Sequence, residues 1–386
     1  MSTVAELAQR GLQALEDRNL DQAIEAFTEA VRLEPERPDM NHALGMAHMH
    51  RGDVLNGLPH LERAVALSEP YTHPDHQALK REFHLELAAV YQLVDRISDA
   101  EAVLRKACDD WEQAPEPRLR LAQLLATSCR VDEAPVLWEE AAALLDGEHR
   151  EAVEALAGAT RAFLDSDHNG NLFLKAHSES YRTYFDEIAA EQAKNGWLPE
   201  AARMARSVDT GEFVPVVSEG TRAWALTRVD LVNPSDGNVS NIYSETEPMI
   251  VALNGLEPLA QVPILLPWPD QAFSTWVCSQ CPWHWLTVVV QFAHPAETDE
   301  ALFDRLDERI GAWYLEGYNG TWGDRDSGRF HYATDPERVG DRAVQYVFDL
   351  GRARYEAIEA LLHRLVLVHD EHPVSRVLLG GGRLPD

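Results

Sequence analysis

The sequence predicts an α-helical solenoid over residues 4–147, additional helices over residues 148–210, and an α+β region over residues 211–386. The solenoid is predicted by a pattern of small and large residues that returns every 34 residues. The additional helices are predicted by apolar residues that continue at helical spacing beyond the repeats. The α+β region follows a change of composition near Gly211, after which Val, Trp and Pro replace Ala, Leu and Glu. Seven of the ten Trp residues lie beyond residue 220.

The repeat pattern consists of four frames, which begin at Val4, Pro38, Arg81 and Pro115. Positions 8, 20 and 27 of every frame carry Gly or Ala, which let neighbouring helices approach closely. Positions 7, 11 and 24 carry mostly larger residues, which fill the space between the helices. The small residues are Gly11, Ala23 and Ala30, then Gly45, Gly57 and Ala64, then Ala88, Ala100 and Ala107, and finally Ala122, Ala134 and Ala141. Each frame is therefore expected to be one helical hairpin that stacks on its neighbours.

This pattern resembles the tetratricopeptide-repeat (TPR) family. The resemblance implies that the first helix of each repeat lines a concave groove, which binds a protein or peptide. We call the residues at the family's groove positions the groove set. It comprises Leu12, Leu15, Glu16, His42, Met46, Met49, His50, Leu85, Gln92, Leu119 and Gln123.

The groove set is largely apolar and includes two Met side chains, which adapt to irregular partners. It contains none of the Lys, Arg and Asn residues with which the family clamps acidic tails. We therefore expect an amphipathic helix or an extended apolar peptide as the ligand. The alternative is that the C-terminal half of the same chain fills the groove.

Two departures from the regular frame are expected. Residues Ser68–Lys80 form an insertion between the second and third frames, with Pro70, Pro74 and two His. A weaker fifth frame from Arg182 suggests a fifth repeat or a cap. The helices expected in this region are Glu148–Leu164, Leu172–Ile188 and Leu198–Val208.

The C-terminal region shows strand and helix patterns in alternation. Strands are expected over Phe213–Val217, Arg222–Val232, Met249–Leu253, Val262–Leu266 and Thr287–Phe292. Later elements are a helix over Asp299–Tyr314, strands near Arg329–Ala333 and Ala343–Asp349, a helix over Arg352–Val368, and a strand over Val374–Leu379. From Thr287 the order is strand, helix, strand, strand, helix, strand, which predicts a ferredoxin-like (split βαβ) sandwich.

Cys278, Cys281 and His284 form the motif with the most chemical character. Two Cys at this spacing are typical of a redox dithiol, or of two zinc ligands with His284 as a third. However, the pair precedes a strand instead of opening a helix, and the chain has no second Cys pair. Buried, inert Cys residues are therefore the competing interpretation.

Asp165, Asp167 and Asn169 resemble the opening of an EF-hand calcium loop, with Gly170 at its sharp turn. The position that carries a bidentate Glu in that loop is Ala176 here, which removes two ligand oxygens. A helix-connecting turn rich in Asp, Asn and Gly has the same composition. Both a calcium site and a plain turn remain open at this point.

The chain is strongly acidic, with a formal charge of −30 from 64 acidic and 34 basic residues. Such a charge repels phosphate backbones, so nucleic acid is not an expected partner. No stretch approaches the roughly 20 apolar residues of a membrane span, and the N-terminus shows no secretory signal. We therefore expect a cytoplasmic protein without a membrane partner, and the excess of Arg over Lys suggests a bacterial source.

These observations predict a protein–protein interaction adaptor or scaffold, whose C-terminal domain is regulatory or supplies a second contact. The alternative is a metal-dependent or thiol enzyme in the C-terminal domain, governed by the repeats. Enzymatic activity is the less favoured class. No cofactor is expected, and zinc or calcium would follow only from the two motifs above.

Overall fold

A computed structural model describes residues 3–94, 96–166, 169–194, 256–269, 271–281, 283–295, 300–323 and 330–381, with short segments at 198–199, 205–206, 213–214, 227–232 and 239–244. The chain divides into two compact units. Unit 1 comprises the chain up to Leu124 together with Glu140–Leu145. Unit 2 comprises Leu125–Glu139 and Asp146–Leu384.

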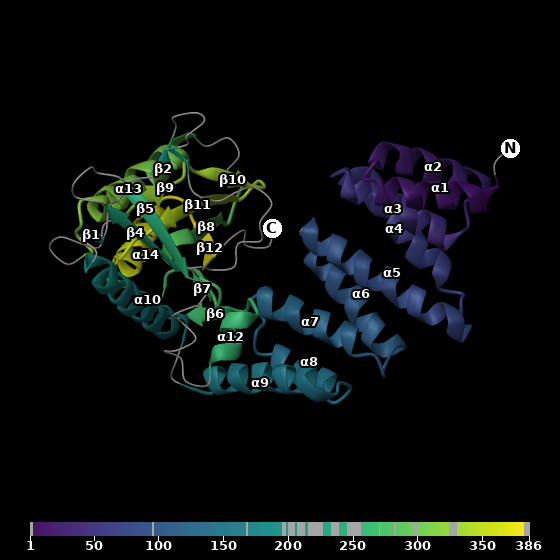
Figure 1. Cartoon of the computed structure of the whole chain (residues 1–386), viewed down its shortest axis with the longest axis horizontal. Helices are drawn as coiled ribbons and strands as arrows, with labels where there is room; N and C mark the ends of the chain where they lie inside the picture. Colours follow the sequence, from purple (N-terminus) through teal and green to yellow (C-terminus); the bar gives the residue numbers. More distant parts are fainter. Residues whose placement is uncertain are drawn as a thin grey trace. The chain divides into compact units, whose positions relative to one another are not determined.

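Helical hairpins follow one another from the N-terminus (Figure 1). The pairs are α1 (Val4–Glu16) with α2 (Leu20–Leu33), α3 (Pro38–His50) with α4 (Val54–Ser68), α5 (Pro74–Leu93) with α6 (Ile97–Asp110), and α7 (Pro115–Thr127) with α8 (Ala134–Ala142). Three of the four predicted frame starts coincide with the first residue of a helix. The predicted helical solenoid is confirmed.

Capping residues fix where the first two helices begin. The Thr3 hydroxyl accepts a hydrogen bond from the Glu6 amide at 3.2 Å, and the Glu6 carboxylate accepts one from the Thr3 amide at 2.8 Å. This reciprocal capping box satisfies two amides that a helix start leaves without partners. Asn19 caps α2 in a similar way, since its Oδ1 accepts a hydrogen bond from the Gln22 amide at 3.2 Å.

The twelve small residues at positions 8, 20 and 27 are all buried. A Cβ atom built on Gly11 would lie 2.5 Å from the ring of Phe27, and one on Gly45 would lie 2.7 Å from Leu61. In both repeats the glycine at position 8 therefore makes room for the large residue at position 24. This close fit is the physical basis of the 34-residue pattern.

The turn within three of the hairpins passes through left-handed backbone at position 15 of the frame. The φ angle is +55° at Arg18, +80° at Gly52 and +60° at Cys129, which are the equivalent positions of frames one, two and four. The third equivalent, Asp95, lies outside the described residues. A Cβ atom makes this conformation cost roughly 1–2 kcal/mol, so Arg18 and Cys129 hold strain that Gly52 avoids.

We expect Arg18→Gly to stabilise the protein by about 0.5–1 kcal/mol. The substitution removes the strained Cβ, and the greater freedom of an unfolded glycine offsets part of that gain. Gly52→Ala should destabilise it by about 1–2 kcal/mol for the same reason. Urea unfolding followed by circular dichroism measures both changes. A less stable Arg18→Gly variant would contradict the assignment of strain.

The insertion Ser68–Lys80 lengthens the first helix of the third repeat. α4 ends at Ser68 and α5 begins at Pro74, so the second part of the insertion forms the first turns of α5. α5 consequently has 20 residues, whereas α1 and α3 have 13 each. The third frame begins inside α5 and not at its start.

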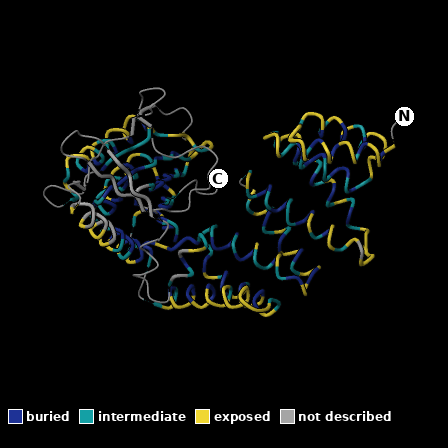
Figure 2. The backbone as a smooth tube through the Cα atoms, in the orientation of Figure 1, coloured by how far each residue is buried: buried dark blue, intermediate teal, exposed yellow. Residues whose placement is uncertain are grey.

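Two further helices, α9 (Gly147–Leu164) and α10 (Gly170–Ala193), belong to unit 2. α9 is amphipathic, as expected, in its second half, where Leu156, Ala157, Ala159, Thr160 and Phe163 are buried; the residues before Leu156 are exposed or half-buried (Figure 2). The fifth frame is not formed as two helices, because Arg182 lies inside α10 and the segments β1 (Leu198–Pro199) and β2 (Ala205–Arg206) are strands. The helix expected over Leu198–Val208 is therefore wrong wherever that stretch is described. The described parts of Leu198–Val208 pair with other strands, which satisfies the hydrogen-bonding groups of their backbone. This pairing overrides the helical propensity of the segment.

The C-terminal part contains a mixed sheet. Its strands are β6 (Leu265–Trp268), β7 (Ser274–Cys278), β8 (Leu286–Phe292), β9 (Tyr332–Ala333), β10 (Glu337–Val339), β11 (Ala343–Asp349) and β12 (Val374–Gly381). The order across the sheet is β10-β11-β8-β12-β7-β6, and β9 pairs with the end of β11. β7 and β12 run parallel, whereas the other described pairs are antiparallel.

Smaller strand groups complete the described part of unit 2. β4 (Thr227–Val232) pairs with β1 and with β5 (Val239–Ser244), while β2 pairs with β3 (Phe213–Val214). The predictions missed β5, β7 and β10, and placed the strand at Val262–Leu266 about three residues too early. The strand expected over Met249–Leu253 lies outside the described residues. Short strands are missed because pairing partners, more than local sequence, decide where they form.

An aromatic core joins α13 (Glu300–Tyr318) to the sheet, and α14 (Glu356–His369) packs beside α13. Trp313 is fully buried, and its indole N–H donates a hydrogen bond to the Ala357 carbonyl at 2.7 Å. Its ring centroid lies 4.6 Å from that of Phe330 and 5.0 Å from that of Phe348 on β11. No helix of the described chain is both long and apolar enough to cross a membrane.

Candidate functional site

The groove set lies on the first helix of each hairpin. Leu12, Leu15 and Glu16 are on α1, His42, Met46, Met49 and His50 on α3, Leu85 and Gln92 on α5, and Leu119 and Gln123 on α7. No member is buried: Leu12 is 56% exposed, and the other apolar members are half-buried. Apolar side chains on the first helices of four successive hairpins are thus partly exposed.

Glu86 on α5 is a further residue of this surface, and sequence reasoning missed it. His42 Nε2 contacts the Glu86 carboxylate, and the His42 ring stacks on Phe83 with ring centroids 4.4 Å apart. These contacts join α3 to α5 within the groove set. Glu86 stands one position beyond a family groove position. Its spacing of four residues from Glu82 places both on one helix face.

The formal charges at the family's groove positions are all negative. Four of these positions carry acids, namely Glu16, Asp39, Glu82 and Glu116, and none carries Lys or Arg. Glu16, Glu82 and Glu116 are exposed, whereas Asp39 accepts a hydrogen bond from Arg37 Nε at 3.0 Å. The surface is therefore apolar with carboxylates beside it.

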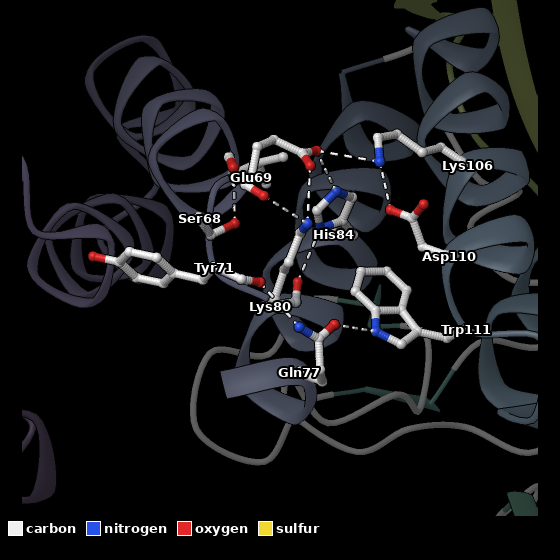
Figure 3. A network of polar contacts seen from close by, with 10 residues as sticks. Ser68, Glu69, Tyr71, Gln77, Lys80, His84, Lys106, Asp110 and Trp111 are labelled. Atoms are coloured by element: carbon white, nitrogen blue, oxygen red, sulfur yellow. Dashed lines mark hydrogen bonds and ion pairs between the residues drawn. The ribbon is translucent and has the colours of Figure 1, made fainter. Parts of the chain in front are cut away.

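A polar network holds the insertion against the third repeat (Figure 3). Lys80 is 8% exposed and His84 is 1% exposed. Lys80 Nζ donates a hydrogen bond to Glu69 Oε2 at 2.9 Å, and His84 Nε2 lies 3.3 Å from Glu69 Oε1. His84 Nδ1 donates a hydrogen bond to the Lys80 carbonyl at 2.9 Å. One carboxylate at the end of α4 thus satisfies two buried groups of α5.

The network continues to α6. Lys106 Nζ lies 3.3 Å from Glu69 Oε1 and also contacts the Asp110 carboxylate. Trp111 Nε1 donates a hydrogen bond to Gln77 Oε1 at 3.2 Å, so the insertion is tied to the second helix of its own repeat. Burial alone raises the pKa of Glu69, but hydrogen bonding and charge from Lys80, together with Lys106, outweigh burial and lower it.

A pocket of about 220 Å³ lies between the insertion and the start of α3. Its lining residues are Arg37, Pro38, Asp39, Ser68, Tyr71, His76, Leu79, Lys80 and Phe83. Tyr71 and Leu79 are each 40% exposed. Figure 3 shows the Tyr71 ring turned away from the polar network. Sequence reasoning placed no site here, because an insertion has no equivalent position in the repeat frame.

Cys278 and Cys281 are both buried, in unit 2. Cys278 ends β7, and a three-residue 3₁₀ helix (Trp283–Trp285) and then β8 come after Cys281. The pair therefore follows a strand as well as preceding one, and it opens no long helix. Burial raises the pKa of Cys278 to about 11 and that of Cys281 well above its ordinary value. A protonated, buried thiol is a poor nucleophile and a poor metal ligand. The side chain of His284 lies outside the described residues.

We expect these two thiols to react with a thiol reagent at pH 8 only after unfolding. Thiol counting in native and in denaturant-containing buffer measures this. The raised pKa of Cys278 also favours the folded state below the unfolded thiol value of about 8.5, and this contribution is lost as the pH rises towards 11. Rapid alkylation of Cys278 in the native protein would restore the redox interpretation.

Of the candidate calcium ligands, Asp165 and Asn169 are described and Asp167 is not. Asn169 Oδ1 accepts a hydrogen bond from the Leu172 amide at 3.1 Å and so caps α10. A Cβ atom built on Gly170 would lie 2.7 Å from the Leu266 carbonyl oxygen, so close packing on β6 explains this glycine. Among the described residues, no three His, Cys, Asp or Glu side chains gather so as to hold a metal ion.

Several solved structures resemble part of this chain. The crystal structure of MamA protein is 16% identical over 42% of this chain and 84% of that one, with a TM-score of 0.35. A putative kinesin light chain of Podosopora anserina with nearly identical TPR-like repeats is 20% identical over 42% and 88%, with a TM-score of 0.36. A tetratricopeptide repeat protein from Parabacteroides merdae is 13% identical over 50% and 68%, with a TM-score of 0.36.

No family model matches the chain, and no curated protein matches it. The geometry of the N-terminal part is itself TPR-like. That geometry consists of the successive helical hairpins, the buried small residues at positions 8, 20 and 27, and the left-handed turns at position 15.

Proposed function

We propose that this protein is a cytoplasmic adaptor whose groove set binds an apolar or amphipathic segment of another protein. The observation that carries the proposal is the line of accessible apolar side chains on four successive first helices, including Leu12, Met46, Met49 and Leu85. Such side chains gain from being covered, because burial removes apolar area from water. Binding of nucleic acid or of a membrane is not part of the proposal.

The domain boundaries proposed are 4–147 for the repeats, 148–210 for the connecting segment, and 211–386 for the C-terminal domain. We further propose a ferredoxin-like core for that domain. The strand order β12-β8-β11-β10, with every neighbouring pair antiparallel, supports it. In this scheme the C-terminal domain regulates the repeats or makes a second contact with the partner.

The double substitution Met46→Glu and Met49→Glu is expected to reduce capture of the partner from a cell lysate at least tenfold. Covering a carboxylate with an apolar ligand costs several kcal/mol, and about 1.4 kcal/mol corresponds to a factor of ten in affinity. Immobilised full-length protein and quantitative mass spectrometry of the bound proteins provide the measurement. Circular dichroism checks that the helices persist.

Leu55→Glu is the matched control, because Leu55 lies on α4, a second helix, and is 89% exposed. It introduces a single negative charge of the same kind at an exposed apolar residue outside the groove set and should leave capture unchanged. Equal capture by the wild type and the double variant would rule out the groove set as the binding surface. So would equal losses in the double variant and in Leu55→Glu.

A further inference from the structure

The insertion Ser68–Lys80 interrupts the repeat pattern, yet buried side chains anchor it: Lys80 and His84 meet Glu69, and Gln77 meets Trp111. The anchored insertion forms one wall of the 220 Å³ pocket beside α3. We propose that this pocket, which we call the insertion pocket, is an anchor subsite of the groove. It takes a bulky apolar side chain of a positively charged amphipathic peptide segment. This inference rests on the proposed adaptor function and names the chemistry of its partner.

The pocket walls favour an apolar side chain. Pro38 of α3, Leu79 and Phe83 of α5, and Tyr71 of the insertion all line the pocket. Leu79 and Tyr71 remain 40% exposed, so a ligand side chain that enters the pocket covers apolar area that the fold itself leaves in water. A pocket of this size accommodates a Leu or Phe side chain.

The positively charged side chains that line the pocket already pair with carboxylates of this chain, so an anionic group of a ligand is disfavoured there. Arg37 donates a hydrogen bond to Asp39 and lies 3.5 Å from the Glu34 carboxylate. Lys80 Nζ is 2.9 Å from Glu69. An anion entering the pocket would have to compete with these carboxylates and would also meet the negative charge of Asp39.

The pocket adjoins the groove set. Phe83 lines the pocket and stacks on His42, a member of the groove set, with ring centroids 4.4 Å apart. Asp39 also lines the pocket and stands at a family groove position on the same helix as His42. A peptide that follows the first helices can therefore place one side chain in the pocket without leaving the surface.

Charge determines the class of peptide. Residues 1–147 contain 27 acidic and 14 basic residues, a formal charge of −13. Glu16, Glu82 and Glu116 are exposed beside the apolar surface. A field of this sign attracts cationic segments and slows the approach of anionic ones. Lys or Arg residues flanking the apolar anchor would therefore meet carboxylates.

Three synthetic peptides of roughly 18 residues, about five helical turns, test the proposal. The first has an apolar face of Leu and Phe and a polar face of Lys. The second has Glu in place of Lys, and the third has Ser in place of Leu and Phe. Fluorescence anisotropy with the full chain should show the first peptide binding at least tenfold more tightly than either of the others. Its affinity should fall with added salt.

Leu79→Glu should weaken binding of the first peptide at least tenfold, and Leu55→Glu should not. If the first peptide bound Leu79→Glu normally but no longer bound Met46→Glu, the insertion pocket would not be a binding subsite, whereas the groove set would remain the binding surface. Equal affinity for the Lys-containing and the Glu-containing peptide would contradict the inference that the partner segment is positively charged. Failure of all three peptides would overturn the inference as a whole, whereas lysate capture by the groove set still decides the proposed function separately.

Discussion

Glu69→Ala is expected to lower the free energy of unfolding by about 2–4 kcal/mol. The substitution leaves Lys80 and His84, which are 8% and 1% exposed, without their carboxylate. Removing one partner of a buried ion pair typically costs about 3–5 kcal/mol, and the partial exposure of Glu69 reduces that figure. Urea unfolding followed by circular dichroism measures the change.

Glu25→Ala is the matched control, since Glu25 is an exposed acid on α2 and its loss should change stability by less than about 0.5 kcal/mol. The difference between wild type and Glu69→Ala should also depend on pH. The pKa of Glu69 is lower in the folded protein than in the unfolded chain, where it is about 4.3. The ion pair therefore stabilises the folded state fully at pH values above the unfolded pKa. This stabilisation is lost as the pH falls through the folded pKa. A difference that does not shrink as the pH falls below about 4.3 would contradict this assignment.

Trp313→Ala is expected to destabilise the C-terminal domain by about 3–5 kcal/mol, the usual cost of deleting a buried Trp side chain. Trp313 is fully buried between Phe330 and Phe348, and its indole N–H donates to the Ala357 carbonyl. The cavity cannot close easily, because Gly317 already approaches so near that a Cβ atom there would lie 2.2 Å from the Phe330 ring. Near-ultraviolet circular dichroism during thermal unfolding reports on this cluster.

Tyr318→Ala on the same helix is the control, because Tyr318 is 46% exposed and should cost less than about 1 kcal/mol. Similar losses in the two variants would mean that Trp313 does not anchor α13 to the sheet. The repeats should remain helical in both variants, so the far-ultraviolet signal separates loss of the C-terminal core from general unfolding.

The sequence predicted the repeats well because their stability is local. Gly11 faces Phe27 and Gly45 faces Leu61 within single hairpins, so residues less than 20 positions apart determine each unit. The same locality allowed the family's groove positions to be placed on α1, α3, α5 and α7. Glu86 was missed since its role depends on His42, which lies 44 residues away on another helix.

The C-terminal part was less predictable for the same physical reason. β7 pairs with β12, about 100 residues later in the chain, and the backbone partner of β1 is β4, which also comes from a distant segment. Gly170 looked like the turn of a calcium loop, whereas its packing against the Leu266 carbonyl becomes visible only when α10 and β6 are placed together. The sequence of such a motif does not show which distant segments of the chain pack against it.

By itself the sequence predicted an acidic array of helical hairpins over residues 4–147, with mostly apolar side chains at the family's groove positions. Periodicity and charge need no knowledge of distant contacts. Only the tertiary structure decided that Cys278 and Cys281 are buried, protonated thiols and that the insertion forms an anchored pocket. Burial and ion pairing depend on which segments meet in space, and Glu69, Lys80 and Lys106 meet only because three helices pack together.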